Sequence, residues 1–262
     1  MTFPFPMFGP GLIGGASFNP LSLSPAAWYD LSDTSTLFQD SGASVPVTAS
    51  GQTLYYLKDK SGNNIHLSAS SSPTAPTWVV SGGYDYAQFT GSSSQVLKSI
   101  VTPSFQLATI ELYMVAQQIS RVGSDGYVSF ATSSGADDGV ADAMVLQSET
   151  NSSFAYAALF DRAYILDVTI PTPLNVYWAY KTSASNVDVS APGESLSSAS
   201  FFTAETTQSG HLFMGCRTNN DAPTTPYLTG NIYQLIVFNS PLSSGDRASL
   251  ITYLGAKAGL TV

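Results

Sequence analysis

The chain has 262 residues, of which 44% are hydrophobic and only 10% are charged, and its formal net charge at pH 7 is -9. This length suits one large all-β domain, and the scarcity of charge implies a surface covered mainly by Ser, Thr, Asn and Gln. Nine scattered Lys and Arg residues cannot form the basic patch that neutralises nucleic-acid phosphates, so nucleic-acid binding is excluded.

Cysteine content and hydropathy further narrow the classes of protein to which the chain could belong. Cys216 is the only cysteine, so no intrachain disulfide or Cys-based zinc site is expected, and its apolar neighbours predict a buried thiol. No apolar run reaches the roughly 18 residues that a membrane-spanning helix needs. The first ten residues lack Lys and Arg and contain several prolines, which is not the pattern of a secretory signal. We therefore expect a protein that stays in the cell, or leaves it by lysis or within a particle.

Residues 1–24 form a segment with its own composition. Phe3, Phe5 and Phe8 alternate with prolines and glycines, which prevents a helix or regular strand. Apolar side chains without regular structure need another surface to cover them. We predict an N-terminal arm whose phenylalanines anchor it to a partner, and a homo-oligomer such as a trimer would dock several arms together. The alternative is an arm folded over its own domain.

Residues 25–262 predict an antiparallel β-sandwich. Short β-branched and aromatic runs are separated by turn residues rich in Gly, Ser and Asn. These candidate strands are Thr77–Val80, Tyr84–Phe89, Gln95–Val101, Ile110–Gln117, Tyr127–Ala131, Ala143–Gln147, Phe154–Phe160, Tyr164–Val168, Asn175–Lys181 and Leu212–Cys216.

The end of the chain predicts one strand and the only substantial helix. Ile232–Phe238 is almost wholly apolar, as in a strand covered on both faces. Pro241 then ends the ladder. Ser243 with Asp246 three residues later resembles a capping box, and Gly259 is placed to end a helix over residues 243–258.

Three blocks of this sequence resemble concanavalin A-like lectin/glucanase (laminin G-like) jelly rolls. They are the closing segment Gly230–Gly259, the Trp28-Tyr29-Asp30 block, and the turn Asp59-Lys60-Ser61-Gly62-Asn63. The stretch Leu37-Phe38-Gln39-Asp40 lies between the Trp28 block and the Asp59 turn, and it is similar to a stretch in phage particle proteins. This chain has Asn64 where others have glycine, which affects the backbone preference of the turn. The resemblance implies an all-β, concanavalin A-like jelly roll with one C-terminal helix, of the kind found in bacteriophage virion structural proteins.

No catalytic constellation is found in the sequence. Jelly-roll glucanases carry two carboxylates on one strand because retaining hydrolysis needs a nucleophile and an acid about 5 Å apart. The four glutamates here stand apart, and only Glu111 lies in a clear strand, where we expect it to face solvent. His66 and His211 are expected at surfaces or strand edges. We therefore predict no catalytic residues and no cofactor.

Two groups of residues are candidate ligand sites. Asp137, Asp138 and Asp142 offer clustered oxygens for a calcium ion, but their spacing equally suits a solvated acidic turn, and no metal site is predicted. Exposed aromatic and amide side chains would suit a surface glycan, although packed tyrosines and an ordinary turn would give the same pattern. The candidate glycan-binding residues are Tyr84, Tyr86, Asn219, Asn220, Asp221 and Tyr227.

The sequence thus favours a non-enzymatic virion structural protein, assembled in the host cytoplasm. Its expected place is an exterior capsid decoration or fibre, attached to other virion proteins through the N-terminal arm. The alternative is a carbohydrate-binding module for host recognition. A polysaccharide hydrolase with unrecognised catalytic residues is the third hypothesis.

Overall fold

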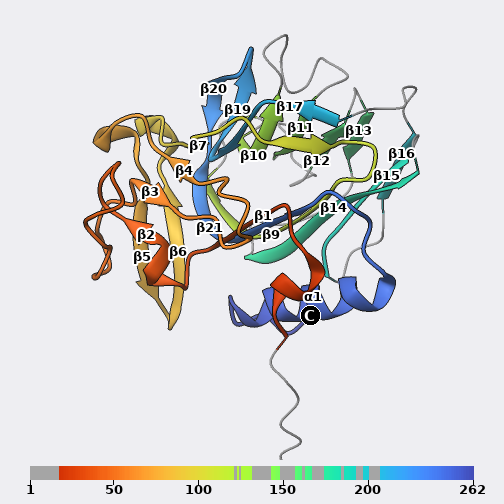
Figure 1. Cartoon of the computed structure of the whole chain (residues 1–262), viewed down its shortest axis with the longest axis horizontal. Helices are drawn as coiled ribbons and strands as arrows, with labels where there is room; N and C mark the ends of the chain where they lie inside the picture. Colours follow the sequence, from red (N-terminus) through yellow and green to blue (C-terminus); the bar gives the residue numbers. More distant parts are fainter. Residues whose placement is uncertain are drawn as a thin grey trace, which may run out of the picture.

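The computed structural model describes residues 18–120, 123, 125–131, 143–147, 157–160, 163–166, 174–183, 186–192, 197–200 and 207–262. Two β-sheets pack face to face, and one α-helix lies across the outer face of one of them (Figure 1). The predicted all-β sandwich with a C-terminal helix is confirmed. Phe3, Phe5 and Phe8 lie outside the described residues, so their predicted anchoring role stays a prediction.

The eight-stranded sheet is built around two long central strands. β9 (Glu111–Ser120) and β21 (Thr229–Phe238) pair antiparallel along their length. β6 (Tyr84–Phe89) and β1 (Ala27–Asp30) share the other side of β21, one after the other. The remaining strands are β5 (Thr77–Ser81) beyond β6, and β14 (Asn175–Ser183), β15 (Asn186–Ser190) and β16 (Ser197–Ser200) beyond β9.

The second sheet has eleven strands, and a two-stranded ribbon of β8 (Ser104–Gln106) and β17 (Thr207–Ser209) accompanies it. One parallel bridge, from Gly126 to Tyr227, interrupts its antiparallel pairing. The path runs through β13 (Ala163–Leu166), β12 (Ala157–Phe160), β11 (Ala143–Gln147), β10 (Gly126–Ala131), β18 (His211–Met214), β7 (Leu97–Ser99), β4 (Leu67–Ser68), β3 (Tyr56–Leu57) and β2 (Leu37–Phe38), with β19 (Cys216–Asn219) and β20 (Ala222–Tyr227) as a hairpin beside it. Cys216 is buried, as predicted.

The central strands are covered on both faces because successive side chains alternate between two cores. Leu112 and Leu235 point into the main core between the sheets. Tyr113 and Ile236 point to the opposite face and join a second core under the helix. This explains why Ile232–Phe238 is apolar almost throughout, and it confirms that prediction.

Helix α1 (Ser244–Ala256) covers this outer face through Leu250 and Leu254. Ser243 is the predicted N-cap, with its hydroxyl accepting a hydrogen bond from the Asp246 amide at 3.1 Å. Gly259 follows the helix at φ +70°, and a Cβ there would lie 2.2 Å from the Tyr84 hydroxyl. Only glycine satisfies both constraints. Four short 3-10 turns complete the helical structure of the described residues: η1 (Pro20–Leu23), η2 (Thr34–Thr36), η3 (Ser72–Thr74) and η4 (Gly91–Ser93).

Glu111 corrects one prediction. It is fully buried, not solvent-facing, because α1 covers the sheet face that the alternation pattern assigned to water. Arg247 of α1 donates to both carboxylate oxygens, from Nε at 3.2 Å and from Nη2. The Tyr113 hydroxyl and the Leu242 amide also donate to Glu111, at 2.6 and 3.0 Å. Arg247 in turn stacks on Tyr180, 3.9 Å from the ring centroid.

The two N-terminal blocks of the jelly-roll resemblance pack against each other. The Asp59 carboxylate accepts from the Trp28 amide at 3.0 Å, and the Lys60 amide donates to the Trp28 carbonyl at 2.8 Å. Asn63 donates to the Pro25 and Ala26 carbonyls. Asn64 adopts φ +61°, the left-handed conformation for which glycine is otherwise used. These residues therefore fix the turn to the first strand.

Candidate functional site

The predicted glycan-binding residues do not form one site. Tyr86 is buried, with its ring 4.9 Å from that of Tyr233. Tyr84 on the same strand is 37% exposed, and its hydroxyl lies over Gly259. Neither ring stands open on a loop, so this pair packs the sheet against the end of α1.

Asn219, Asn220 and Asp221 form the tip of the β19–β20 hairpin. Asn220 and Asp221 have φ of +50° and +57°, which are conformations that Asn and Asp tolerate in tight turns. Asp221 is already engaged, because its carboxylate lies 2.6 Å from His211 Nδ1 and 3.6 Å from Lys98 Nζ. This segment is a turn whose acidic side chain binds neighbouring strands.

Tyr227, at the other end of β20, does line a pocket. The cavity measures about 390 Å³ and has no charged residue in its wall. Its lining residues are Gly91, Ser92, Ser94, Thr225, Pro226 and Tyr227. Tyr227 is half-buried, so part of its ring remains accessible. Burial raises the pKa of the Tyr227 hydroxyl, and a hydrogen bond with Ser94 opposes that rise.

The loop over Tyr227 is held close by a glycine. The Gly91 amide donates to Thr229 Oγ1 at 3.0 Å, and a Cβ on Gly91 would lie 2.5 Å from the Tyr227 carbonyl oxygen. The Ser94 amide closes the turn on the Gly91 carbonyl at 3.0 Å. Sequence reasoning treated this Gly-Ser-Ser-Ser run as a spacer between strands, and no local signal distinguishes the two roles.

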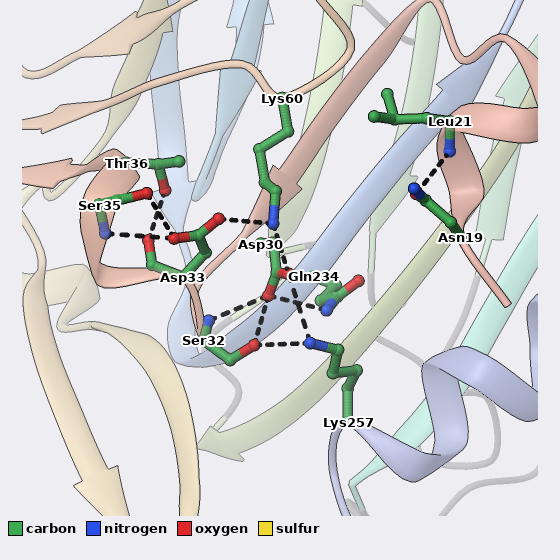
Figure 2. Close-up of polar contacts among 10 residues, drawn as sticks. All are labelled: Asn19, Leu21, Asp30, Ser32, Asp33, Ser35, Thr36, Lys60, Gln234 and Lys257. Atoms are coloured by element: carbon green, nitrogen blue, oxygen red, sulfur yellow. Dashed lines mark hydrogen bonds and ion pairs between the residues drawn. The ribbon is translucent and has the colours of Figure 1, made fainter. Parts of the chain in front are cut away.

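A second cluster, the Asp30 cluster, lies on the outer face of the eight-stranded sheet (Figure 2). Asp30 is 2% exposed and sits at the end of β1, opposite Gln234 of β21. Lys60 reaches it from the turn after β3, and Lys257 from the end of α1, at 3.0 and 3.4 Å. Lys60 also pairs with Asp33 at 2.7 Å.

The electrostatics of this cluster push two aspartates in opposite directions. Burial opposes ionisation of Asp30, but hydrogen bonds from Ser32 and the charges of Lys60 and Lys257 outweigh it, so its pKa is lowered. Burial, reinforced by the negative charge of Asp30, raises the pKa of Asp85. Asp30 is fully occupied as an acceptor and is not free to act as a nucleophile or base.

A cavity of about 370 Å³ opens beside the Asp30 cluster, between residues 18–20 and the last turns of α1. Its apolar wall is formed by Phe18, Pro20, Trp28 and Tyr253, and its polar wall includes Lys60 and Lys257. The Trp28 indole N–H is buried and has no hydrogen-bond partner among the described residues. Sequence reasoning assigned Trp28 and Asp30 only to a fold signature, because their partners are remote in the sequence.

The acidic cluster and the histidines singled out in the sequence form no metal site within the described residues. No group of three or more His, Cys, Asp or Glu side chains there is arranged to hold a metal ion, and Asp137, Asp138 and Asp142 lie outside those ranges. His66 is a half-buried acceptor, with Nδ1 receiving the Asp59 amide at 3.0 Å. No helix in the same ranges is long and apolar enough to span a membrane.

No family model and no curated protein sequence matches the chain, whereas several solved structures of carbohydrate-active proteins match its fold. A GH54 α-L-arabinofuranosidase soaked with a cyclic sulfate inhibitor matches 89% of this chain and 63% of its own, with 12% identity and a TM-score of 0.63. The match to the Trypanosoma rangeli sialidase in complex with 2,3-difluorosialic acid covers 99% of this chain and 36% of the sialidase chain, with 11% identity and a TM-score of 0.52. The match to the CBM40 of a Ruminococcus gnavus sialidase, bound to α2,3-sialyllactose, covers 56% of this chain and 83% of the CBM40 chain, with 11% identity and a TM-score of 0.44.

These matches correct two expectations from the sequence. The chain was expected to be a virion structural protein without enzymatic activity, but the matched sandwiches with TM-scores above 0.5 belong to an arabinofuranosidase and a sialidase. The virion assignment depended on a phage resemblance that none of these comparisons supports. At 11–12% identity the similarity shows a shared β-sandwich fold and nothing more, because one fold hosts many functions.

Proposed function

We propose that the protein binds carbohydrate, and that the Tyr227 pocket is its sugar-binding site. The observation that carries this proposal is an accessible tyrosine ring beside a proline ring and two serine hydroxyls in a wall without charge. The matches to an arabinofuranosidase and a sialidase support a sugar as the ligand.

The chemistry of the wall matches a neutral sugar ring. A pyranose has an apolar face of C–H groups, which packs on an aromatic ring, and a rim of hydroxyls, which needs hydrogen-bonding partners. Tyr227 and Pro226 supply the apolar surface, and Ser92 and Ser94 supply hydroxyls that donate and accept. A volume of about 390 Å³ is within the usual range of small-ligand pockets.

The pocket is also preorganised, which reduces the ordering cost of binding. The Gly91 amide holds the loop to Thr229, and the Ser94 amide closes the turn on the Gly91 carbonyl. The Ser93 amide also donates to the Thr90 carbonyl, at 2.9 Å. The serine side chains are therefore presented by a fixed backbone.

The test is a glycan array probed with the wild type, Tyr227→Ala, Tyr227→Phe and the control Tyr84→Ala. Tyr227→Ala is expected to weaken binding at least tenfold, a hot-spot loss of about 1.4 kcal/mol or more. Tyr227→Phe keeps the stacking surface and loses the Ser94 contact, so it is expected to retain most of the affinity. Tyr84→Ala removes a tyrosine from the other sheet and leaves binding unchanged. Equal binding by Tyr227→Ala and the wild type would refute the site.

The same preparations are assayed for release of reducing sugar from any glycan that binds. Two matched structures are glycoside hydrolases, so turnover is measured directly. Release of reducing sugar by the wild type would show that the protein also hydrolyses the glycan that it binds.

A further inference from the structure

We propose that the cavity beside the Asp30 cluster binds an uncharged group that accepts hydrogen bonds and carries a methyl, and that its ligand class is an N-acetylated sugar. The choice of a sugar as the carrier of this group rests on the proposed function. The choice of the acetamido group follows from the cavity itself, and this cavity is separate from the Tyr227 pocket.

The carboxylate in the cavity wall, Asp30, is already saturated as an acceptor. Asp30 Oδ1 receives the Ser32 amide at 3.1 Å, the Ser32 hydroxyl at 2.6 Å and Gln234 Nε2 at 2.9 Å. Oδ2 receives Lys60 at 3.0 Å and Lys257 at 3.4 Å. A carboxylate has about four lone-pair positions, so five donors leave none for a ligand. A ligand group that must donate here would displace a protein contact.

Donors, by contrast, remain available. Each ammonium group has three N–H bonds. Lys60 directs two toward Asp30 and Asp33, and Lys257 directs two toward Asp30 and Ser32. Each lysine therefore has one N–H left. Trp28, which also lines the cavity, has a buried N–H without a hydrogen-bond partner among the described residues, and Lys60 lies over its ring at 4.4 Å from the centroid.

Charge balance disfavours a carboxylate ligand. The two lysines are matched by Asp30 and Asp33, and Asp85 lies within the negative field of Asp30. A further anion would add like-charge repulsion without an uncompensated cation to bind it. A carbonyl accepts hydrogen bonds without bringing charge.

The apolar wall accounts for the rest of the ligand. Phe18, Pro20, Trp28 and Tyr253 surround the polar floor, and a methyl group beside the carbonyl would be removed from water there. A plain sugar hydroxyl fits less well because it has no methyl group for this apolar wall to cover. The acetamido N–H can face Asn19, whose Oδ1 accepts one hydrogen bond from the Leu21 amide at 3.1 Å and has a second lone pair.

The experiment follows the three tryptophan indole N–H signals by ¹H–¹⁵N NMR during titration with N-acetylglucosamine, glucose and glucuronate. Trp28, identified by its loss in Trp28→Phe, is expected to shift with N-acetylglucosamine alone. Trp78 and Trp178 are internal controls, since the Trp78 N–H is bonded to the Leu31 carbonyl at 2.9 Å and Trp178 lines a different cavity. No Trp28 response, or an equal or larger response to glucose or glucuronate, would overturn the proposal.

A variant pair tests the donors. Lys257→Met keeps most of the side-chain stem and removes the ammonium group, and is expected to weaken N-acetylglucosamine binding about tenfold, the loss of one hydrogen bond from a charged donor. Lys98→Met, which removes a lysine paired with Asp221 instead, is expected to leave it unchanged. Unchanged affinity in Lys257→Met with an unaltered fold would also overturn the proposal.

The two proposals can fail separately. Array binding abolished by Tyr227→Ala, with a silent Trp28 signal, would support the proposed function and overturn this inference. A Trp28 response to N-acetylglucosamine with Tyr227-independent array binding would support this inference and overturn the Tyr227 site.

Discussion

Replacing Arg247 tests the coupling between the helix and the sheet. Arg247→Met removes the guanidinium from a carboxylate that is fully buried. The remaining donors, Tyr113 and Leu242, do not supply a positive charge. Breaking a buried ion pair by removing one partner costs about 3–5 kcal/mol. For 262 residues, at about 2.1 cal/mol/K per residue, that loss lowers Tm by about 5–9 °C.

The reciprocal change is expected to cost less. Glu111→Gln leaves the unpaired charge on Arg247, whose side chain is 22% exposed and can reach water. We expect a loss of about 1–3 kcal/mol, the cost of a hydrogen-bonded partner to a charged group. The double variant Glu111→Leu/Arg247→Met removes both charges, and such replacements are often neutral or stabilising, so its stability is expected to lie closer to the wild type than that of Arg247→Met.

Scanning calorimetry and urea unfolding measure the three variants, with Lys98→Met as the control for loss of a partly exposed cation. The expected order of stability is wild type, then Glu111→Gln, then Arg247→Met. A Tm within about 1 °C of the wild type for Arg247→Met would show that the pair is not formed or that solvent reaches Glu111, and the reasoning from burial would fail.

Three further predictions concern the two sites and the helix. Gly91→Ala forces a Cβ to within 2.5 Å of the Tyr227 carbonyl, so it is expected to destabilise the fold by about 1–3 kcal/mol in urea unfolding and to reduce glycan binding; wild-type values for both would contradict the close approach. Asp30 has a lowered pKa in the folded state, so the stability that its ionised form contributes is complete above its unfolded pKa of about 4 and is lost as the pH falls through the lower folded value. The loss of unfolding free energy in Asp30→Asn is therefore expected to shrink toward pH 2. A loss that stays constant with pH in unfolding titrations would refute this. Ser243→Ala removes the N-cap of α1 and is expected to cost about 1 kcal/mol, measured by the same unfolding assay, whereas Ser249→Ala on the exposed face of the helix should change little.

The features that the sequence predicted correctly are those specified by near neighbours. Ser243, Asp246 and Gly259 fix both ends of α1 within the helix itself and its flanks. The apolar run Ile232–Phe238 likewise carries its own evidence of burial on both faces. Such local patterns determine the type of an element before its partners are known.

The features that were missed depend on remote partners. Glu111 was assigned to solvent because period-two alternation states only that its face differs from that of Leu112, and not what covers that face. The covering residue, Arg247, is 136 positions away. The wall of the Tyr227 pocket likewise joins Gly91 to Thr229 across 138 positions, so the serine-rich turn carried no sign of its role.

β21 connects the two proposed sites because it changes neighbours along its length. Its first residues pair with β6 and its later residues with β1, and the register with β9 shifts between Ile232 and Gln234. Such a bulge turns side chains out of the regular alternation. Thr229 at one end of the strand anchors the loop over Tyr227, and Gln234 after the bulge donates to Asp30. A single strand that a sequence pattern identifies only as buried therefore contributes long-range hydrogen bonds to both proposed sites.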